Sequence, residues 1–258
     1  MFKFFKKKEP IPHTTIVEKA REYNDIMPIA KYFHNETGIT FDKQISILKN
    51  KVISFCRQRD IHSFEQLLHD IKSHSNIKQE LIDHLTTNET YFYRETKQIF
   101  ELVELVKESN SNVNILCAPS STGEEPYSIA IALLEAGVLS SKFNILGIDI
   151  NSDAINKSQS AIYGERNVRK LSEEIISKYF LIKDNKYCLN QNIKSLVSFK
   201  VVNLFDASFN SLGKFDFVFS RNMLIYFDKA TKLKAKSILE SIRKTDEHQV
   251  FFGHADLF

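Results

Sequence analysis

The chain has 258 residues, 43% of them hydrophobic and 26% charged, enough for a substantial core in one large or two small domains. The net charge of +3 is too small to indicate nucleic-acid binding, and no apolar run reaches about 18 residues, the length of a membrane span. Three widely separated cysteines and scattered histidines show no metal-ligand spacing, so we expect reduced thiols, no metal site and a cytoplasmic protein.

The chain begins with a basic, aromatic segment, Met1–Lys8, that lacks the long apolar core of a signal peptide. We interpret it as a basic tail, with a contact to a membrane surface or a partner as the alternative. Up to about residue 95 the patterns predict only helices with short connections, which is typical of a compact helical domain. The signals are Thr14 or Thr15 capping a helix to about Asn24, Pro28 and Gly38 at the ends of the next, Asp42 capping a third, a capping box of Ser63 and Gln66, and the apolar series Ile77, Leu81, Ile82 and Leu85.

From about residue 113 short apolar strands alternate with helices, which predicts a mostly parallel sheet with covered faces. The expected elements are strand 113–117, helix 124–136, strand 144–150, helix 152–160, strands 199–202 and 215–220, helix 228–242 and strand 249–253. A helix capped by Ser172, a hairpin of 180–182 and 187–189, and a candidate third strand at 196–199 predict a small antiparallel insertion. The fold class is therefore α/β: a Rossmann-like sheet domain (96–258) with an N-terminal helical domain (1–95) and a β subdomain at about 180–199.

The loop after the first strand is the most informative segment. From Ala118 to Gly123 the chain turns through small residues into a helix, which is how an open α/β sheet forms a ligand pocket. Glu124 and Glu125 begin that helix, so anionic groups occupy the place of a bound phosphate and favour a cationic ligand. S-adenosylmethionine carries an ammonium and a sulfonium and no phosphate. The single glycine, in place of GxGxxG, disfavours NAD.

The next strand ends at Asp149. An acid at this place can accept hydrogen bonds from both ribose hydroxyls of an adenosine. The alternative is that Asp149 only caps the following helix. Together with the preceding small-residue loop, the ribose interpretation is favoured.

Two further clusters carry polar groups. Segment 85–95 places Thr, Asn and Arg between aromatic residues, and it either caps a helix beside a hydrophobic hinge or closes over a ligand at the domain interface. Segment 215–227 is a strand that ends in Ser220, Arg221 and Asn222 before Tyr226. Because the carboxyl ends of strands face the ligand crevice, these side chains are placed to meet a ligand. The alternative puts Arg221 in a surface ion pair and Tyr226 in the core.

Together these clusters resemble the CheR-type chemoreceptor glutamate O-methyltransferases. The resemblance covers nearly the whole chain from about Ile26, including the order of helical domain, sheet domain and small β insertion. The residues that carry it are Thr86 to Thr90 with Phe92 and Arg94, Ser120 to Ser128, Asp149, Asn203 with Leu204, and Arg221 with Asn222 and Ile225 to Phe227.

The resemblance implies a protein-glutamate O-methyltransferase for chemotactic adaptation. Its cofactor would be S-adenosylmethionine, its product S-adenosylhomocysteine, and its partner the cytoplasmic domain of a chemoreceptor (a methyl-accepting chemotaxis protein). Neither nucleic acid nor membrane insertion is implied, and we expect a monomer. The implied cofactor contacts are Asn88, Thr90, Arg94, Glu124 or Glu125, Asp149, Asn203, Leu204, Arg221 and Asn222, with Tyr226 near the sulfonium and the incoming glutamate.

The chemistry needs no general base, because a glutamate with a pKa of about 4.3 is already ionised at pH 7. We expect Arg94 to hold the substrate carboxylate and Tyr226 to orient it or the sulfonium, as the two catalytic residues. Family members meet acidic receptor helices with a basic helix of the helical domain. The residues predicted to do so here are Lys49, Lys51, Arg57 and Arg59, with a solvated charged face as the alternative.

Two departures and two rival functions remain. Relatives continue beyond a motif like 253–256 into a last antiparallel strand that has no counterpart here, so we expect binding to survive and the sheet edge to be less stable. The hairpin turn 183–186 lacks glycine, which favours independence from a receptor tail peptide. The rivals are a methyltransferase for nucleic acid or small molecules, disfavoured by the lack of a Pro-Pro aromatic motif, and a cofactor-binding sensor, disfavoured by Arg94 and Tyr226.

Overall fold

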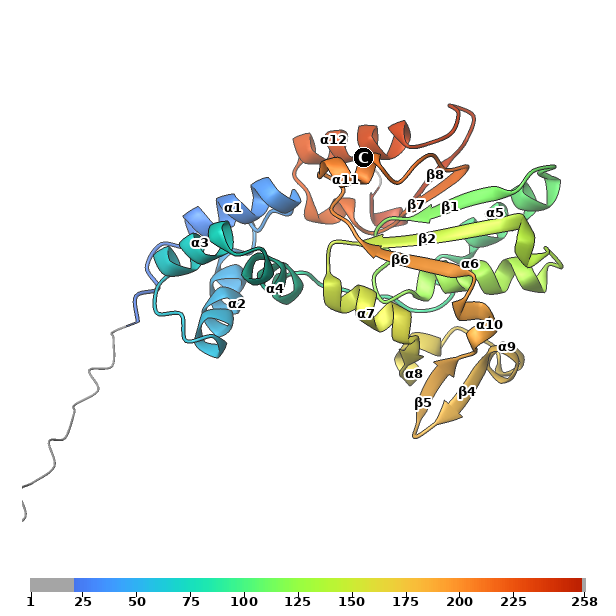
Figure 1. Ribbon diagram of the computed structural model, residues 1–258, viewed down its shortest axis with the longest axis horizontal. Coiled ribbons are helices and arrows are strands. Elements are labelled where there is room, and N and C mark those ends of the chain that lie inside the picture. The colour runs from blue at the N-terminus through green and yellow to red at the C-terminus, as the bar shows by residue number, and fades with distance from the viewer. Residues whose placement is uncertain (1–20, 257–258) are drawn as a thin grey trace, which may run out of the picture.

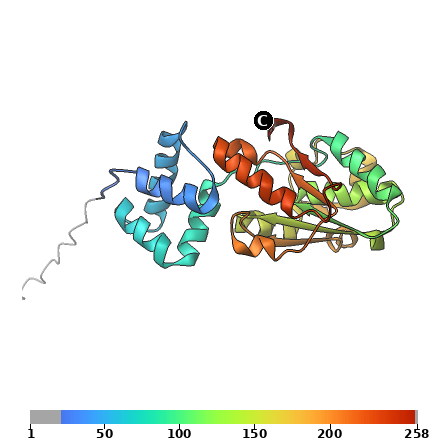
Figure 2. The same cartoon turned by 90° about the horizontal axis from the view of Figure 1, so that it is seen from above.

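The computed structural model describes residues 21–256. A helical region and a sheet region lie side by side in an elongated molecule, and both views place the helical region at one end (Figures 1 and 2). The segment Met1–Lys8 and most of the expected first helix fall outside the described residues. The described end of that helix, residues 21–24, is not helical, so the prediction is wrong there.

The helical region is a small bundle with its own core. Leu48, Val52 and Phe55 of one helix are fully buried against Phe33 and Leu67 of two others, because apolar residues at spacings of three and four share one helix face. The helices are α1 (Met27–Thr37), α2 (Ile45–Gln58), α3 (Phe64–Ser73) and α4 (Ser75–Leu85).

The helix ends follow most of the predicted signals. Gly38 ends α1 with a left-handed φ of 73°, which glycine adopts at little cost. The side chain of Ser63 caps α3 by accepting a hydrogen bond from the N–H of Gln66 at 3.0 Å. The prediction for Asp42 is wrong, since α2 begins after Gln44 without a side-chain cap.

A five-stranded parallel sheet forms the centre of the second region, with strand order β6-β2-β1-β7-β8. The chain moves outward from β1 in one direction and then crosses back to β7, so the sheet has a topological switch point beside β1. Because the strands are parallel, their carboxyl ends share one edge, where ligands bind in doubly wound sheets. The strands are β1 (Val113–Cys117), β2 (Phe143–Asp149), β6 (Val197–Val201), β7 (Phe217–Ser220) and β8 (Val250–Phe252).

Helices cover both faces of this sheet, which confirms the predicted fold class. Ile115 and Cys117 of β1 pack with α5 and α6 on one face, while Leu116 packs with α12 on the other. The helix α5 has no counterpart among the predicted elements. The helices are α5 (Thr96–Glu108), α6 (Glu124–Glu135), α7 (Ser152–Ser160), α11 (Ala207–Asn210) and α12 (Lys229–Ser241).

A small antiparallel sheet of strand order β3-β5-β4 projects from the main body (Figure 1). The hairpin is confirmed, but its third strand is β3. The segment predicted for that place, 196–199, instead joins β6, which gains a full parallel ladder with β2. The elements are β3 (Ile162–Tyr163), α8 (Glu165–Val168), α9 (Glu173–Tyr179), β4 (Phe180–Lys183), β5 (Lys186–Leu189) and α10 (Gln191–Lys194), with the 3-10 helices η1 (Ser140–Lys142), η2 (Leu224–Tyr226) and η3 (His254–Asp256).

Candidate active site

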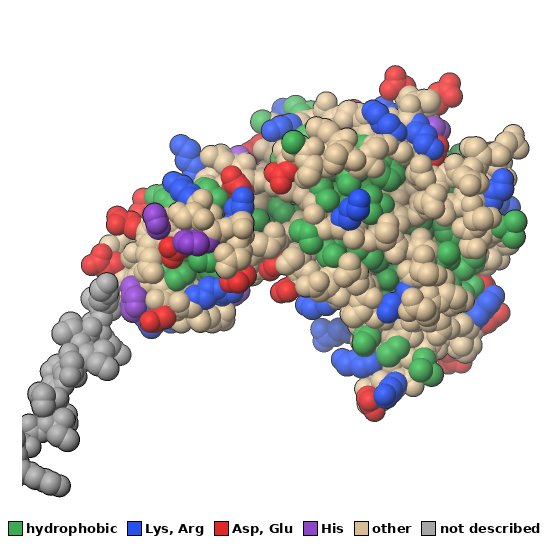
Figure 3. Space-filling view, in the orientation of Figure 1, with side chains coloured by type: hydrophobic (Ala, Val, Ile, Leu, Met, Phe, Trp, Pro, Cys, Tyr) green, Lys and Arg blue, Asp and Glu red, His purple; other side chains and the backbone are tan. Residues whose placement is uncertain are grey.

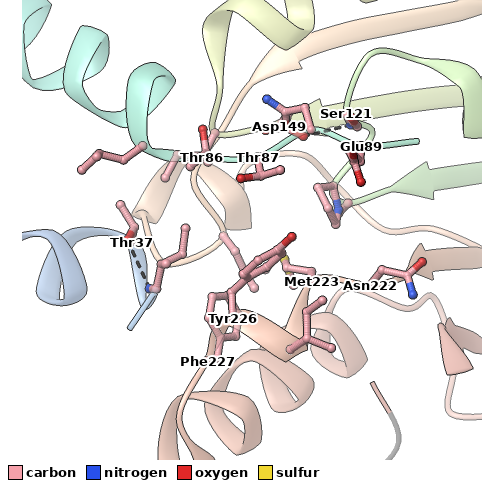
Figure 4. Close-up of a pocket in the computed structure, with 18 of the residues that line it drawn as sticks. Thr37, Thr86, Thr87, Glu89, Ser121, Asp149, Asn222, Met223, Tyr226 and Phe227 are labelled. Atoms are coloured by element: carbon pink, nitrogen blue, oxygen red, sulfur yellow. Dashed lines mark hydrogen bonds between the residues drawn. The ribbon is translucent and has the colours of Figure 1, made fainter. Parts of the chain in front are cut away.

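A cavity of about 420 Å³ lies between the carboxyl edge of the sheet and the helical region (Figure 4). Its volume falls in the range of small-molecule sites. Four loops from the sheet and the segment after α4 form its wall, and the α1–α2 connection with part of α2 closes the opposite side. The predicted cofactor and catalytic residues that line it are Asn88, Thr90, Arg94, Glu125, Asp149, Asn203, Leu204, Arg221, Asn222 and Tyr226.

Asp149 lies at the end of β2 with only 4% of its surface exposed. Its carboxylate accepts hydrogen bonds from the N–H of Ser121 and the N–H of Asn151, both at 2.9 Å. Burial raises the pKa of Asp149 to about 6, and these N–H groups oppose that rise. The following helix α7 is capped by the side chain of Asn151, so the capping alternative for Asp149 is wrong.

The two glutamates that begin α6 have different environments. Glu124 is fully buried away from the cavity, where it accepts hydrogen bonds from Asn167 at 2.6 Å and Thr122 at 2.7 Å. Burial raises the pKa of Glu124. Glu125 lines the cavity instead and pairs with Arg221. Of the two candidates, Glu125 lines the cavity and Glu124 does not.

Arg221 joins two walls of the cavity. Its Nε donates to Glu125 Oε2, and its Nη1 donates to the carbonyl oxygens of Arg94 at 2.8 Å and Glu95 at 3.2 Å. Only 3% of its side chain is exposed, so the surface ion-pair alternative is wrong. The guanidinium balances the charge of Glu125 and holds the backbone at Arg94 and Glu95 beside the start of α6.

The segment after α4 crosses from the helical region to the sheet along the cavity. Phe92 anchors it by packing edge-on against Tyr163 and Phe180, with centroids 4.9 and 5.3 Å apart. Arg94 lies half-buried on the cavity wall and donates to the carbonyl oxygen of Glu89 at 3.2 Å. The segment therefore lies along the cavity between the two regions, and its closure over a ligand stays a prediction.

Tyr226 is the most exposed of the predicted catalytic residues, at 40%. It projects from η2 into the space between Thr37 and the Thr86–Glu89 segment (Figure 4). Its carbonyl oxygen accepts a hydrogen bond from the N–H of Thr40 at 2.9 Å, which ties the α1–α2 connection to this wall. The alternative placement of Tyr226 in the core is wrong.

Several lining residues are absent from the sequence prediction. Asn203 was predicted, and its side chain donates at 2.6 Å to the carbonyl oxygen of Glu36 in α1. This contact brings the helical region against the cavity. The helical region thereby contributes lining residues that the sequence did not predict. They carry no local sequence signal for a ligand site, because only tertiary packing places them at the cavity: Thr37, Ile39, Phe41, Gln44 and Ile47.

The four basic residues predicted to bind substrate do not share one surface. Lys51 lines the cavity, whereas Lys49 donates to the carbonyl oxygen of Asn24 at 3.2 Å. Two residues along a helix are separated by about 200° around its axis, so these two lysines point apart. Arg59 pairs with Glu80 at 2.6 Å, and Arg57 is exposed. On the face drawn in Figure 3, positive and negative side chains are interspersed over the helical region.

The cavity contains unused polar groups that suit S-adenosylmethionine. The hydroxyls of Ser120 and Ser121 and the Oε1 atom of Glu125 are buried without a hydrogen-bond partner within residues 21–256. Such groups need a partner, since an unsatisfied buried polar atom costs about 1–3 kcal/mol. A carboxylate at Glu125 suits an ammonium, and Asp149 suits ribose hydroxyls. The fold and this site define a methyltransferase that uses S-adenosylmethionine.

Comparison with known proteins places the chain within that class. The family model described as "CheR methyltransferase, SAM binding domain" matches residues 88–258. A chemotaxis protein methyltransferase of Campylobacter jejuni is 39% identical over 228 residues, covering 88% of this chain and 86% of the relative. Similar relatives from Borreliella burgdorferi (31% over 249 residues, 90% and 88%) and Salmonella typhimurium (30% over 238 residues, 89% and 82%) carry the same name. The chain belongs to the CheR methyltransferase family.

Proposed function

We propose that the protein transfers a methyl group from S-adenosylmethionine to glutamate side chains in the cytoplasmic domain of chemoreceptors, for chemotactic adaptation. Family membership supports the reaction. One observation supports an acidic substrate. The lining residues suited to an incoming carboxylate, Lys51, Arg94 and Tyr226, are all partly exposed, whereas the acids Glu125 and Asp149 are buried.

The groups on the sheet side of the cavity and on the segment after α4 would hold the cofactor. Glu125 faces its ammonium, Asp149 its ribose, and Asn203 and Leu204 flank its adenine, with Asn88, Thr90, Arg221 and Asn222 completing the wall. Of the described residues that line the cavity, none is a histidine or a cysteine. This composition is compatible with a substrate carboxylate that is already ionised at pH 7.

When bound, the cofactor supplies a methyl group on a positively charged sulfur. Transfer of that methyl group to a carboxylate oxygen would break the sulfur–carbon bond and give a neutral ester and a thioether, so the cavity has to align the carboxylate with the sulfonium. Because opposite charges cancel, exclusion of water from the cavity favours the reaction. Arg94 holds the substrate carboxylate and Tyr226 orients it, and positioning of this kind contributes about 7–11 kcal/mol.

A labelling experiment tests the proposed function. Receptor fragments are incubated with the protein and methyl-labelled cofactor, and the product is treated with alkali. Carboxyl methyl esters release labelled methanol. Label that resists alkali would identify a methyltransferase for another substrate, and no transfer despite cofactor binding would identify a sensor. Either result contradicts glutamate methylation.

A substitution tests the role of Arg94. We expect Arg94→Ala to lower the methylation rate by about a hundredfold at saturating receptor, because the substrate carboxylate loses its partner. Arg166→Ala, on the exposed surface of α8, is the matched control and should be active. Full activity of Arg94→Ala would show that another group holds the substrate.

The remaining proposals concern the protein as a whole. We propose that residues 1–95 recognise the receptor and residues 96–258 hold the cofactor, and that the protein acts as a cytoplasmic monomer. Among the described helices, none is long and apolar enough to cross a membrane. Light scattering on the purified protein tests the monomer, and cell fractionation tests the location.

A further inference from the structure

A fully buried carboxylate lies behind the cavity wall that carries Tyr226. Asp256, in η3, accepts hydrogen bonds through Oδ2 from the N–H of Asn222 and the N–H of Gly253, the latter at 3.2 Å. Burial raises the pKa of Asp256, and the N–H groups of Asn222, Leu224, Gly253 and Ile225 oppose this rise. The carboxylate therefore faces the backbone of the turn that precedes Tyr226.

The turn at Asn222 is held from several sides. Asn222 has a φ of 59°, in the left-handed region that residues with a side chain seldom adopt, although Asn tolerates it better than most. Its Nδ2 lies 3.4 Å from Glu95 Oε1, and Glu95 pairs with His254 at 3.0 Å. A Cβ added at Gly253 would lie 2.8 Å from the N atom of Asn222, so only glycine permits this close approach. The segment 253–256 thus packs directly on the turn.

We propose that Asp256 is a positioning residue for methyl transfer, which holds the turn 222–226 so that Asn222 and Tyr226 keep their places on the cavity wall. Asp256 is not among the residues that line the cavity and acts through Asn222. The inference rests on the proposed function, because it assigns Tyr226 to the reacting end of the site. It extends the site to a segment that follows β8.

The structure offers a matched control at the opposite edge of the sheet. Asp216 is also buried, with 6% exposed, and its Oδ2 accepts a hydrogen bond from the N–H of Asn114 at 2.7 Å and pairs with Lys244. Asp216→Ala and Asp256→Ala each remove a buried acid that binds backbone. Of the two acids, only Asp256 contacts a residue that lines the cavity, Asn222. Asp256→Asn keeps an acceptor oxygen for Asn222 and is the conservative variant.

Kinetics at a temperature where all variants are folded test the proposal. We expect Asp256→Ala to lower kcat by about tenfold to a hundredfold, because small displacements of reacting groups have effects of that size. Cofactor affinity, measured by calorimetry, should fall by no more than about fivefold and by less than kcat, because the turn contributes only Asn222 to the cofactor wall while Glu125 and Asp149 are untouched. Asp256→Asn should recover most of kcat, and Asp216→Ala should keep kcat while losing stability. A kcat of Asp256→Ala within about twofold of the parent, or an equal loss in Asp216→Ala, would overturn the proposal.

An NMR readout separates this proposal from the proposed function. The amide signals of residues 222–226 should move in Asp256→Ala and stay in place in Asp216→Ala. If the parent protein transfers no methyl group to receptor, the proposed function fails. The amide signals then still report whether Asp256 holds the turn, and unchanged signals in Asp256→Ala would contradict that separately.

Discussion

The two sides of the cavity hold their groups in different ways. On the sheet side, Asp149, Glu125 and Arg221 are buried and fixed by backbone groups or by one another. On the helical side, the lining includes neutral residues such as Gln44 and Ile47, which are both exposed, Ile47 at 47%. Removing the partner of a buried charge is strongly destabilising, so buried charged side chains keep one arrangement. Neutral, exposed side chains can change conformation at little cost. We therefore expect the sheet side to control folding and cofactor affinity, and the helical side to control the approach of substrate.

The ion pair of Glu125 with Arg221 should give the largest effect. Replacing Arg221 by Met leaves a buried carboxylate without its partner, and we expect a loss of about 3–5 kcal/mol in the free energy of unfolding, measured by urea denaturation. The double variant Glu125→Gln with Arg221→Met should recover part of this loss, because no uncompensated charge remains. If the single variant is as stable as the parent, the sheet side is not held by this pair.

Asp149 should give the next effect, on the cofactor. Asp149→Asn cannot accept hydrogen bonds on both atoms, and we expect S-adenosylmethionine to bind about a hundredfold more weakly by calorimetry, each lost hydrogen bond to a charged group contributing about 1.5–3 kcal/mol. The matched control is Asp153→Asn, which makes the same change in the first turn of α7, outside the cavity lining, and should bind like the parent. Equal affinities of Asp149→Asn and the parent would exclude the ribose role.

The pKa of Asp149 adds a pH dependence with a definite sign. Its folded-state pKa is about 6 and its ordinary value is 3.8, so cofactor binding, which needs the ionised form, should weaken as pH falls through 6. Only about a tenth of Asp149 is ionised at about pH 5, so the affinity for S-adenosylmethionine there should be about tenfold lower than at about pH 7.5. The effect of Asp149 on the free energy of unfolding has the opposite pH dependence. Without cofactor, the folded protein binds the proton more tightly than the unfolded chain does, so the contribution of Asp149 to stability falls as pH rises from about 4 to about 6. A pH-independent affinity would contradict the first statement.

The joint between the two regions should give a smaller effect. Asp83 of α4 accepts hydrogen bonds from the N–H of Ser152 at 2.7 Å and from Gln79 at 2.9 Å, which ties α4 to the first turn of α7. Asp83→Ala should reduce stability by about 1–3 kcal/mol through the unpaired N–H of Ser152. Hydrogen exchange should rise in α4 and at the start of α7. Exchange that rises throughout the sheet as well would indicate global destabilisation instead of a loosened joint.

The same contrast explains which parts of the site could be predicted. Each sheet-side residue follows a strand with a clear apolar pattern, so Asp149 and Arg221 could be placed from local sequence and the rule for strand ends. Thr37 and Ile47 belong to helices whose apolar pattern does not include them, and they reach the cavity only through long-range contacts such as Asn203 with Glu36. The strand β3 has two residues, too few for a periodic signal, and so the third strand of the small sheet was misassigned.

The smallest expected effect concerns the lysines of α2. Lys51 borders the cavity, while Lys49 points elsewhere and contacts Asn24. We expect Lys51→Gln to raise the KM for an acidic receptor fragment by about threefold to fivefold at low salt, with cofactor affinity unchanged, and the effect should fade at high salt because partly exposed charges are screened. Lys49→Gln is the matched control and should leave KM unchanged. Equal changes in both variants would show that the whole charge of α2, and not the cavity rim, steers the substrate, and the helical side would then act at longer range than its lining residues indicate.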